Sequence, residues 1–166
     1  MNTSKIKPYV PALLWMAVMF TLSTHYFGSA FTKPIIGRIL DFIGYNYDAS
    51  SLNTADFIVR KSAHVFIYAV LAVLWYRAAL KGSRRNMARA GLTVLLICAL
   101  WASSDEIHQY LAGGRGAEVS DVVLDTATSA LAIVVTAFIS GAGKRKTPRG
   151  GGVSIHTTTA GGQGLP

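Results

Sequence analysis

The sequence is poor in charged residues and in cysteine. Charged side chains make up 14% of its 166 residues, whereas a typical soluble domain carries about 25%. Hydrophobic residues make up 51% of the chain, and the mean hydropathy is +0.38. Such an apolar composition excludes an intrinsically disordered chain. The single cysteine, Cys98, lies in an apolar run, which excludes a disulfide-stabilised scaffold.

Acidic residues are also scarce, because 8 Asp and Glu stand against 16 Lys and Arg, for a net charge of +8. The basic residues lie between apolar runs instead of forming one patch, so a nucleic-acid-binding domain is excluded. The length of the chain favours one domain. These properties together indicate a small integral membrane protein.

Four apolar segments approach the roughly 20 helical residues needed to cross a hydrocarbon core of about 30 Å. They are residues 9–26, 63–80, 87–104 and 122–140. Each is apolar around its whole circumference, as expected for helices in lipid or in a bundle interior. The sequence therefore predicts an all-α fold, a four-span transmembrane helical bundle. A soluble bundle with unusually apolar helices is the alternative.

The first apolar run has a second interpretation, a cleaved signal peptide. Lys5 and Lys7 precede the run, and the small residues from Gly28 to Ala30 resemble a cleavage site. The run is long for a signal peptide, however, which favours a membrane span.

The charges of the connecting segments predict the orientation. Eleven basic residues and no acid lie in the N-terminal segment, in the loop between the second and third spans, and in the tail. All eight acids lie in the other two loops and the span ends that flank them. Cytoplasmic loops carry the excess of Lys and Arg. Both termini are therefore predicted in the cytoplasm of a plasma-membrane protein, which requires an even number of spans.

The first outer loop contains a segment with helical periodicity between Pro34 and Gly44. Pro34 suits the first turn of a helix, and apolar residues follow at helical spacing: Ile35, Ile36, Ile39, Leu40 and Ile43. This pattern predicts an amphipathic helix. Such a helix lies in the lipid headgroups, packs as part of the loop, or covers an outer site as a lid.

Two further boundaries follow from local sequence. Asn53 or Thr54 is predicted to cap the second long helix, with Asp56 in its first turn. The domain is predicted to end near residue 140. Residues 141–166 are rich in Gly, Thr and Pro and are predicted to form a disordered cytoplasmic tail, whose basic cluster meets anionic lipid.

Ionisable and polar residues gather at the outer ends of three predicted spans. On the second span, Lys61, His64 and Tyr68 share one helical stripe. At the end of the third span, Asp105 lies one turn from Gln109.

Glu106, the neighbour of Asp105, faces about 100° away from it around the same helix. The fourth span opens with Asp121 and Asp125 on one stripe. The glycine-rich turn before that span allows Arg115 to fold back over the cluster.

The cost of burying charge predicts how this cluster is arranged. A charge inside hydrocarbon costs a few kcal/mol unless it is paired or hydrated. His64 and Asp125 lie about one turn inside their spans, so they are predicted to face each other or a wet cavity. The simplest ion pairs join one of two bases to one of three carboxylates: Lys61 or Arg115 with Asp105, Asp121 or Asp125.

Three functions are compatible with this cluster: a structural clamp between helix ends, a pocket for a polar headgroup, sugar or peptide carboxylate, and catalysis. Catalysis would use His64 as a general base, or a metal held by His64, Asp105, Glu106 and His108. No spacing matches a metal signature such as H-E-x-x-H. No metal or other cofactor is therefore predicted.

Four motifs resemble those of the VanZ-like family of small membrane proteins: His64-Val-Phe-Ile-Tyr68, Asp105-Glu-Ile-His-Gln109, Gly114-Arg115 and Asp121-Val-Val-Leu-Asp125-Thr-Ala-Thr128. The family pattern reads His-Phe-x-x-Tyr, Asp-Glu-x-x-Gln, Gly-Arg and Asp-x-x-x-Asn-x-x-Gly. This chain departs from it at Val65, where Phe is usual, and at Asp125 and Thr128, where Asn and Gly are usual. The resemblance covers roughly residues 9–140.

The founding member of that family is associated with low-level resistance to the glycopeptide teicoplanin, a role that is not carried over to this chain. The resemblance implies a cell-envelope setting, with membrane lipids as partners and a cell-wall precursor or a glycopeptide as a further candidate ligand. The favoured interpretation is non-catalytic binding of a polar envelope ligand. The alternatives are a membrane-embedded hydrolase or transferase acting on a lipid-linked substrate through His64, Asp105 and Glu106, and a structural partner subunit.

Overall fold

The computed structural model describes residues 6–23, 29–82, 86–111 and 118–142. These residues form a short 3-10 helix, η2 (Lys7–Tyr9), and five α-helices: α1 (Val10–Leu22), α2 (Ser29–Phe42), α3 (Ala49–Gly82), α4 (Met87–Leu111) and α5 (Val119–Ala142). The described residues contain no strand, so the predicted all-α class is confirmed. Arg115 and residues 143–166, about which the sequence makes predictions, lie outside the described residues.

Three of these helices are long and apolar enough to cross a membrane: Ala49–Lys81, Met87–Leu111 and Val119–Gly141. The first apolar run forms a shorter apolar helix over Lys7–Leu22, and residues 24–26 of the predicted span lie outside the described residues. The helices of the second, third and fourth predicted spans are thus present. The fourth crossing that the sequence predicts, by the first run, stays a prediction.

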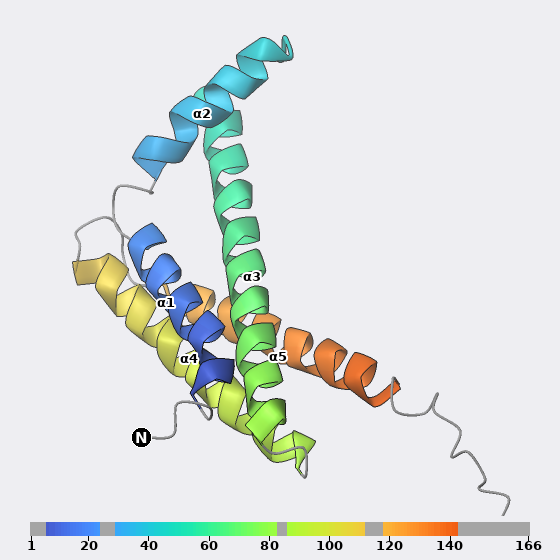
Figure 1. Ribbon diagram of the computed structural model, residues 1–166. Helices are drawn as coiled ribbons and strands as arrows, with labels where there is room; N and C mark the ends of the chain where they lie inside the picture. Colours follow the sequence, from blue (N-terminus) through green and yellow to red (C-terminus); the bar gives the residue numbers. More distant parts are fainter. Residues whose placement is uncertain (1–5, 24–28, 83–85, 112–117, 143–166) are drawn as a thin grey trace, which may run out of the picture.

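The other helices pack around α3 (Figure 1). Helix α3 is 34 residues long, which corresponds to roughly 50 Å and exceeds a hydrocarbon core of about 30 Å. Helix α2 packs against its N-terminal end, whereas α1, α4 and α5 pack against it further along the chain. Helix α5 also packs against α4. One end of α3 therefore extends beyond the bundle and carries α2.

Small side chains allow the long helices to approach one another closely. Ala72, Cys98 and Ala102 lie in the buried core beside larger residues: Met19, Tyr68, Leu71, Tyr76, Val94 and Ile133. A Cβ atom at Gly91 of α4 would lie 3.3 Å from Ile133 of α5, so the two helices nearly touch there. Packing through small residues is typical of membrane helices.

The first turn of α3 is capped by Asp48, and not by Asn53 or Thr54 as predicted. Its carboxylate accepts hydrogen bonds from the backbone N–H of Ser51 at 2.8 Å and from the Ser51 hydroxyl at 2.6 Å. The helix thus begins at Ala49, and the predicted caps lie inside it. The predicted caps lie next to the apolar run, whereas the helix begins before that run and includes a polar segment.

Helix α2 begins earlier than the sequence predicts, at Ser29, so Pro34 lies inside the helix instead of in its first turn. The early start has a tertiary cause. Both Ser29 and Thr32 donate hydrogen bonds to the carboxylate of Asp56 on α3. These bonds tie the first turn of α2 to α3 and offset the backbone hydrogen bond that Pro34 removes.

We predict that Asp48→Ala speeds hydrogen exchange of the Ser51 and Leu52 amides by a factor of roughly two to ten, because the N-cap acceptor is lost. The hydrogen bonds from Ser51 lower the pKa of Asp48. The cap is therefore fully present above the unfolded pKa of Asp and is lost as the pH falls through the lower folded value.

Ser50→Ala is the matched control, because the Ser50 hydroxyl makes no hydrogen bond among the described residues and is exposed. Equal exchange rates in Asp48→Ala and the unmodified chain would show that Asp48 does not cap α3.

Candidate functional site

A polar cavity of about 390 Å³ lies between α2, α3 and the facing ends of α4 and α5. Phe57 is the one apolar residue in its wall among the described residues. The remaining lining residues are polar or ionisable: Ser29, Lys33, Asn53, Asp56, Arg60, Lys61, His64, Glu106, Glu118 and Asp121. Four sequence-predicted site residues, Lys61, His64, Glu106 and Asp121, thus lie in one wall.

Lys61 of α3 forms an ion pair with Asp121 of α5. Its Nζ atom also lies 3.6 Å from Oε2 of Glu118, just before α5 begins. The side chains of Lys61 and Asp121 are 23% and 10% exposed, so the pair is largely withdrawn from water. The predicted stripe on α3 therefore meets the predicted stripe on α5, and the pair is one of those the sequence predicts.

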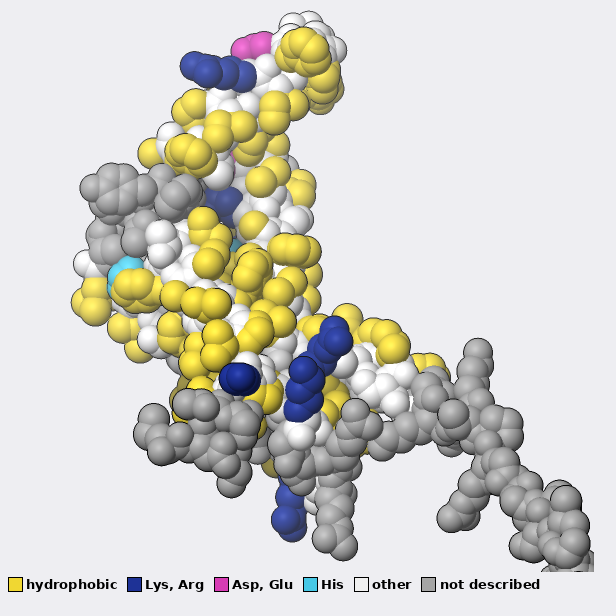
Figure 2. All heavy atoms as spheres, in the orientation of Figure 1, with side chains coloured by type: hydrophobic (Ala, Val, Ile, Leu, Met, Phe, Trp, Pro, Cys, Tyr) yellow, Lys and Arg dark blue, Asp and Glu magenta, His cyan; other side chains and the backbone are white. Residues whose placement is uncertain are grey.

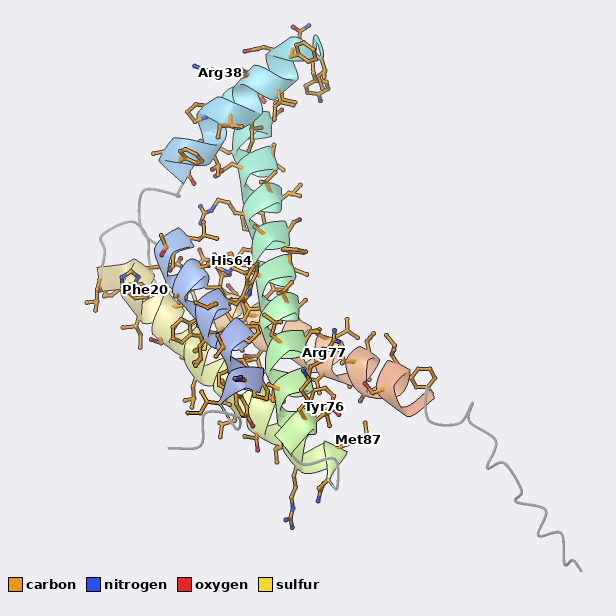
Figure 3. The ribbon with its side chains drawn as sticks, viewed as in Figure 1. Phe20, Arg38, His64, Tyr76, Arg77 and Met87 are labelled. Atoms are coloured by element: carbon orange, nitrogen blue, oxygen red, sulfur yellow. The ribbon has the colours of Figure 1, made fainter. Side chains whose placement is uncertain are left out.

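One turn deeper, His64 of α3 faces Asp125 of α5, with Nδ1 3.2 Å from Oδ2. Asp125 is buried, and its other oxygen, Oδ1, has no hydrogen-bond partner among the described residues. His64 lines the cavity, whereas Asp125 lies behind it. Figure 3 labels His64 on α3, with its side chain directed into the bundle. His64 and Asp125 therefore face each other, which is one of the two arrangements that the sequence leaves open.

Tyr68 and Asp105 extend the polar cluster into the core. The Tyr68 side chain is fully buried, its ring stacks beside the His64 ring with the centroids 6.3 Å apart, and its hydroxyl has no partner among the described residues. Asp105 of α4 accepts a hydrogen bond from Gln109 at 3.0 Å, one turn along the same helix. Asp105 and Gln109 therefore meet as their spacing predicts, without a base in direct contact among the described residues.

Glu106 has a role that its sequence position does not reveal. Its Oε1 atom accepts a hydrogen bond from the backbone N–H of Glu118 at 2.6 Å. The first N–H groups of a helix lack partners within the helix, and a carboxylate there is stabilised by the helix dipole. Glu106, which is itself buried, thus joins the end of α4 to the beginning of α5.

The structure also places at the site residues that the sequence does not predict there. Asp56 of α3 is buried and accepts the hydrogen bonds of Ser29 and Thr32 from α2. Arg60, one turn further along α3, donates from Nη1 to Ser29 Oγ at 2.8 Å. The spacing of Asp56, Arg60 and His64 at intervals of four residues was a signal for one shared face.

The sequence of the chain also matches the model of a known protein family. The model for VanZ/LLP1 matches residues 9–140, which is most of the chain. The protein belongs to the VanZ/LLP1 family. Comparisons with curated proteins and with solved structures find no match. The resemblance carried by the four sequence motifs is thereby confirmed.

The cluster combines internal ion pairs with an open cavity, whose wall carries both hydrogen-bond donors and acceptors. Within the described ranges, no three His, Cys, Asp or Glu side chains are arranged to hold a metal ion. Acid–base chemistry is geometrically available at His64, because Asp125 holds one ring nitrogen and the ring lines the cavity.

We predict that Lys61→Met destabilises the protein by about 3 kcal/mol, because it leaves the buried Asp121 carboxylate without its base. Thermal unfolding of the purified protein in detergent micelles measures the effect. Lys81→Met, an exposed position at the other end of α3, is the matched control and should cost less than about 1 kcal/mol. An unchanged midpoint for Lys61→Met would mean that the ion pair contributes nothing to stability.

Asp125→Asn is expected to leave stability unchanged within about 1 kcal/mol or to raise it. The amide oxygen still accepts a hydrogen bond from His64, and the cost of burying a charge disappears. The same thermal assay checks this prediction. A large loss of stability would instead show that the buried charge of Asp125 is needed to hold His64.

Proposed function

We propose that this VanZ/LLP1 membrane protein binds the polar group of a cell-envelope ligand in the cavity between α2, α3, α4 and α5. The observation that carries the proposal is the open volume of about 390 Å³ in a wall of ionisable side chains. Ligand cavities in proteins span about 300–1,000 Å³. A purely structural clamp needs only the pairs themselves, such as Lys61 with Asp121, and no accessible space beside them.

The distribution of charge supports an outward-facing cavity. On the face shown in Figure 2, Lys and Arg side chains gather toward the end where α3 finishes and α4 begins. Arg77 lies at that end (Figure 3), away from the cavity. By the positive-inside rule this end faces the cytoplasm. The cavity then faces outward from the plasma membrane, and with a fourth crossing by the first run both termini are cytoplasmic.

Helix α2 supports a position of the cavity at the level of the lipid headgroups. Phe31, Ile35, Ile39 and Phe42 follow one another at intervals of three or four residues, and each is at least 45% exposed. Such a stripe suits an amphipathic helix lying in the membrane interface. Ser29 and Lys33 of the same helix line the cavity, so α2 forms its outer wall.

The size of the cavity limits the class of ligand. About 390 Å³ accommodates a lipid headgroup, a sugar or a short peptide carboxylate, but only part of a glycopeptide. Envelope lipids and lipid-linked cell-wall precursors present such groups at the outer surface while their chains stay in the bilayer. They are the ligands that fit the site best.

The His64–Asp125 contact favours a second candidate function, a hydrolase or transferase acting on a lipid-linked phosphate or ester. A carboxylate that fixes one imidazole nitrogen leaves the other available as a general base. His64→Gln separates the two functions. A binding protein shows no turnover in either form, whereas an enzyme turns over its substrate in the unmodified form and loses that turnover in His64→Gln.

The proposal predicts that Asn53→Trp weakens ligand binding by about tenfold or more, because the indole fills cavity volume. Asn53 lines the cavity and makes no side-chain hydrogen bond among the described residues, so the fold should persist. The measurement is the binding of a lipid-linked cell-wall precursor, phosphatidylglycerol and teicoplanin to the full chain in nanodiscs.

Ser62→Trp is the control, because Ser62 is an exposed residue of α3 that does not line the cavity. Binding that survives Asn53→Trp would refute the proposed function. If no member of the panel binds the unmodified protein, a role as a structural partner subunit is favoured instead.

A further inference from the structure

We infer that the wall formed by α2 and α3 is an anion-binding subsite, in which Arg60 and Lys33 hold a singly charged phosphodiester or carboxylate of the ligand. The inference rests on the proposed function and specifies the chemistry of its ligand.

The carboxylates of the wall have partners. Asp121 is paired with Lys61, Glu106 accepts a backbone N–H, and Asp56 accepts two hydroxyl groups of α2. Glu118 also lies within ion-pair distance of Lys61. Lys61 thus contacts two acids, and each of the four carboxylates has at least one donor or cation within the described residues.

Two bases of the wall are not matched in this way. Within the described part of the chain, Lys33 makes no ion pair or side-chain hydrogen bond, and no carboxylate lies within ion-pair distance of Arg60. Asp56 and Glu118 act on Arg60 only through longer-range attraction. A guanidinium has five N–H donors, and one hydrogen bond, to Ser29, is formed here.

The surroundings of Arg60 hold its guanidinium in place. Ser29 accepts the hydrogen bond from Arg60 and donates its own proton to Asp56, at 2.7 Å. A guanidinium fixed at one nitrogen can still offer its planar fork to two oxygens of a phosphate or carboxylate. Lys33 follows Ser29 by one helical turn and lines the same cavity, so it supplies a second positive charge.

The total charge of the wall restricts the anion. The lining residues include four acids against three bases. A multiply charged anion such as free phosphate is therefore disfavoured, whereas a phosphodiester or a carboxylate carries one charge. These groups occur both in amphiphiles of the envelope and in small soluble molecules, so the experiment must separate the two sources.

The test is titration of the full chain in neutral maltoside micelles with short-chain phosphatidylglycerol, and with diacylglycerol of the same chain length as the uncharged match. Arg60→Gln should weaken binding of phosphatidylglycerol by about tenfold or more, because a hydrogen bond to a charged group contributes about 1.5–3 kcal/mol. Lys33→Gln should weaken it in the same direction. Arg77→Gln, at the other end of α3, is the matched control and should leave the affinity within about twofold.

Equal affinity of Arg60→Gln and the unmodified chain for phosphatidylglycerol would overturn the inference, as would equal affinity for phosphatidylglycerol and diacylglycerol. Competition by soluble glycerophosphoglycerol supports the subsite and assigns a soluble anion, whereas absence of competition supports it and assigns an amphiphile. If Arg60→Gln fails to fold, Lys33→Gln carries the test, because Lys33 has no partner to lose within the described residues. Binding that Asn53→Trp blocks and Arg60→Gln spares refutes the anion subsite alone, and leaves the proposed function standing.

Discussion

The cost of placing ionisable side chains in apolar surroundings is the constraint on which the rest of this structure depends. Asp105, Asp121 and Asp125 are buried, although the helices that carry them are apolar over most of their length. A buried charge costs several kcal/mol unless it is matched. Two polar contacts between α3 and α5, Lys61 with Asp121 and His64 with Asp125, meet this requirement for Asp121 and Asp125. A shift of either helix by one turn would break both, so the polar contacts fix the register of the bundle.

The same constraint explains which parts of the site could be predicted from the sequence. Helical periodicity places Lys61 and His64 on one stripe, and the cost of burial favours acids opposite them. The two contacts with α5 are therefore among the arrangements that the sequence allows, although the sequence does not choose between them and the alternatives. The role of Glu106 does not follow, because its partner is a backbone N–H, and every residue except proline carries one. A side-chain pattern cannot single out that partner until the ends of two helices are known to meet.

The wrong predictions for the segment between α1 and α3 share a tertiary origin. Pro34 suggested a helix start, yet α2 begins at Ser29 because a carboxylate 27 residues further along the chain accepts its hydroxyl proton. The sequence predicts Asp56 in the first turn of α3, whereas Asp56 lies well inside that helix and accepts hydrogen bonds from α2. Local propensities of Pro, Asn and Thr amount to about 1 kcal/mol or less at most boundary positions. The two hydrogen bonds that the buried carboxylate of Asp56 accepts from hydroxyl groups of α2 outweigh these local propensities.

The proposed binding is compatible with contacts that hold the helices together, because the two would use different levels of one cluster. The deeper level, around Asp125, Asp105 and Tyr68, is closed by apolar packing and makes direct contacts between helices. The other level contains the cavity, and there Arg60 and Lys33 make no direct ion pair with a carboxylate of the described residues. The hydrogen bond from Arg60 to Ser29, which itself donates to Asp56, positions the guanidinium beside the cavity, and a group that is already positioned lowers the ordering cost of binding. A cluster built only to hold helices together would have no reason to leave its bases unmatched beside open volume.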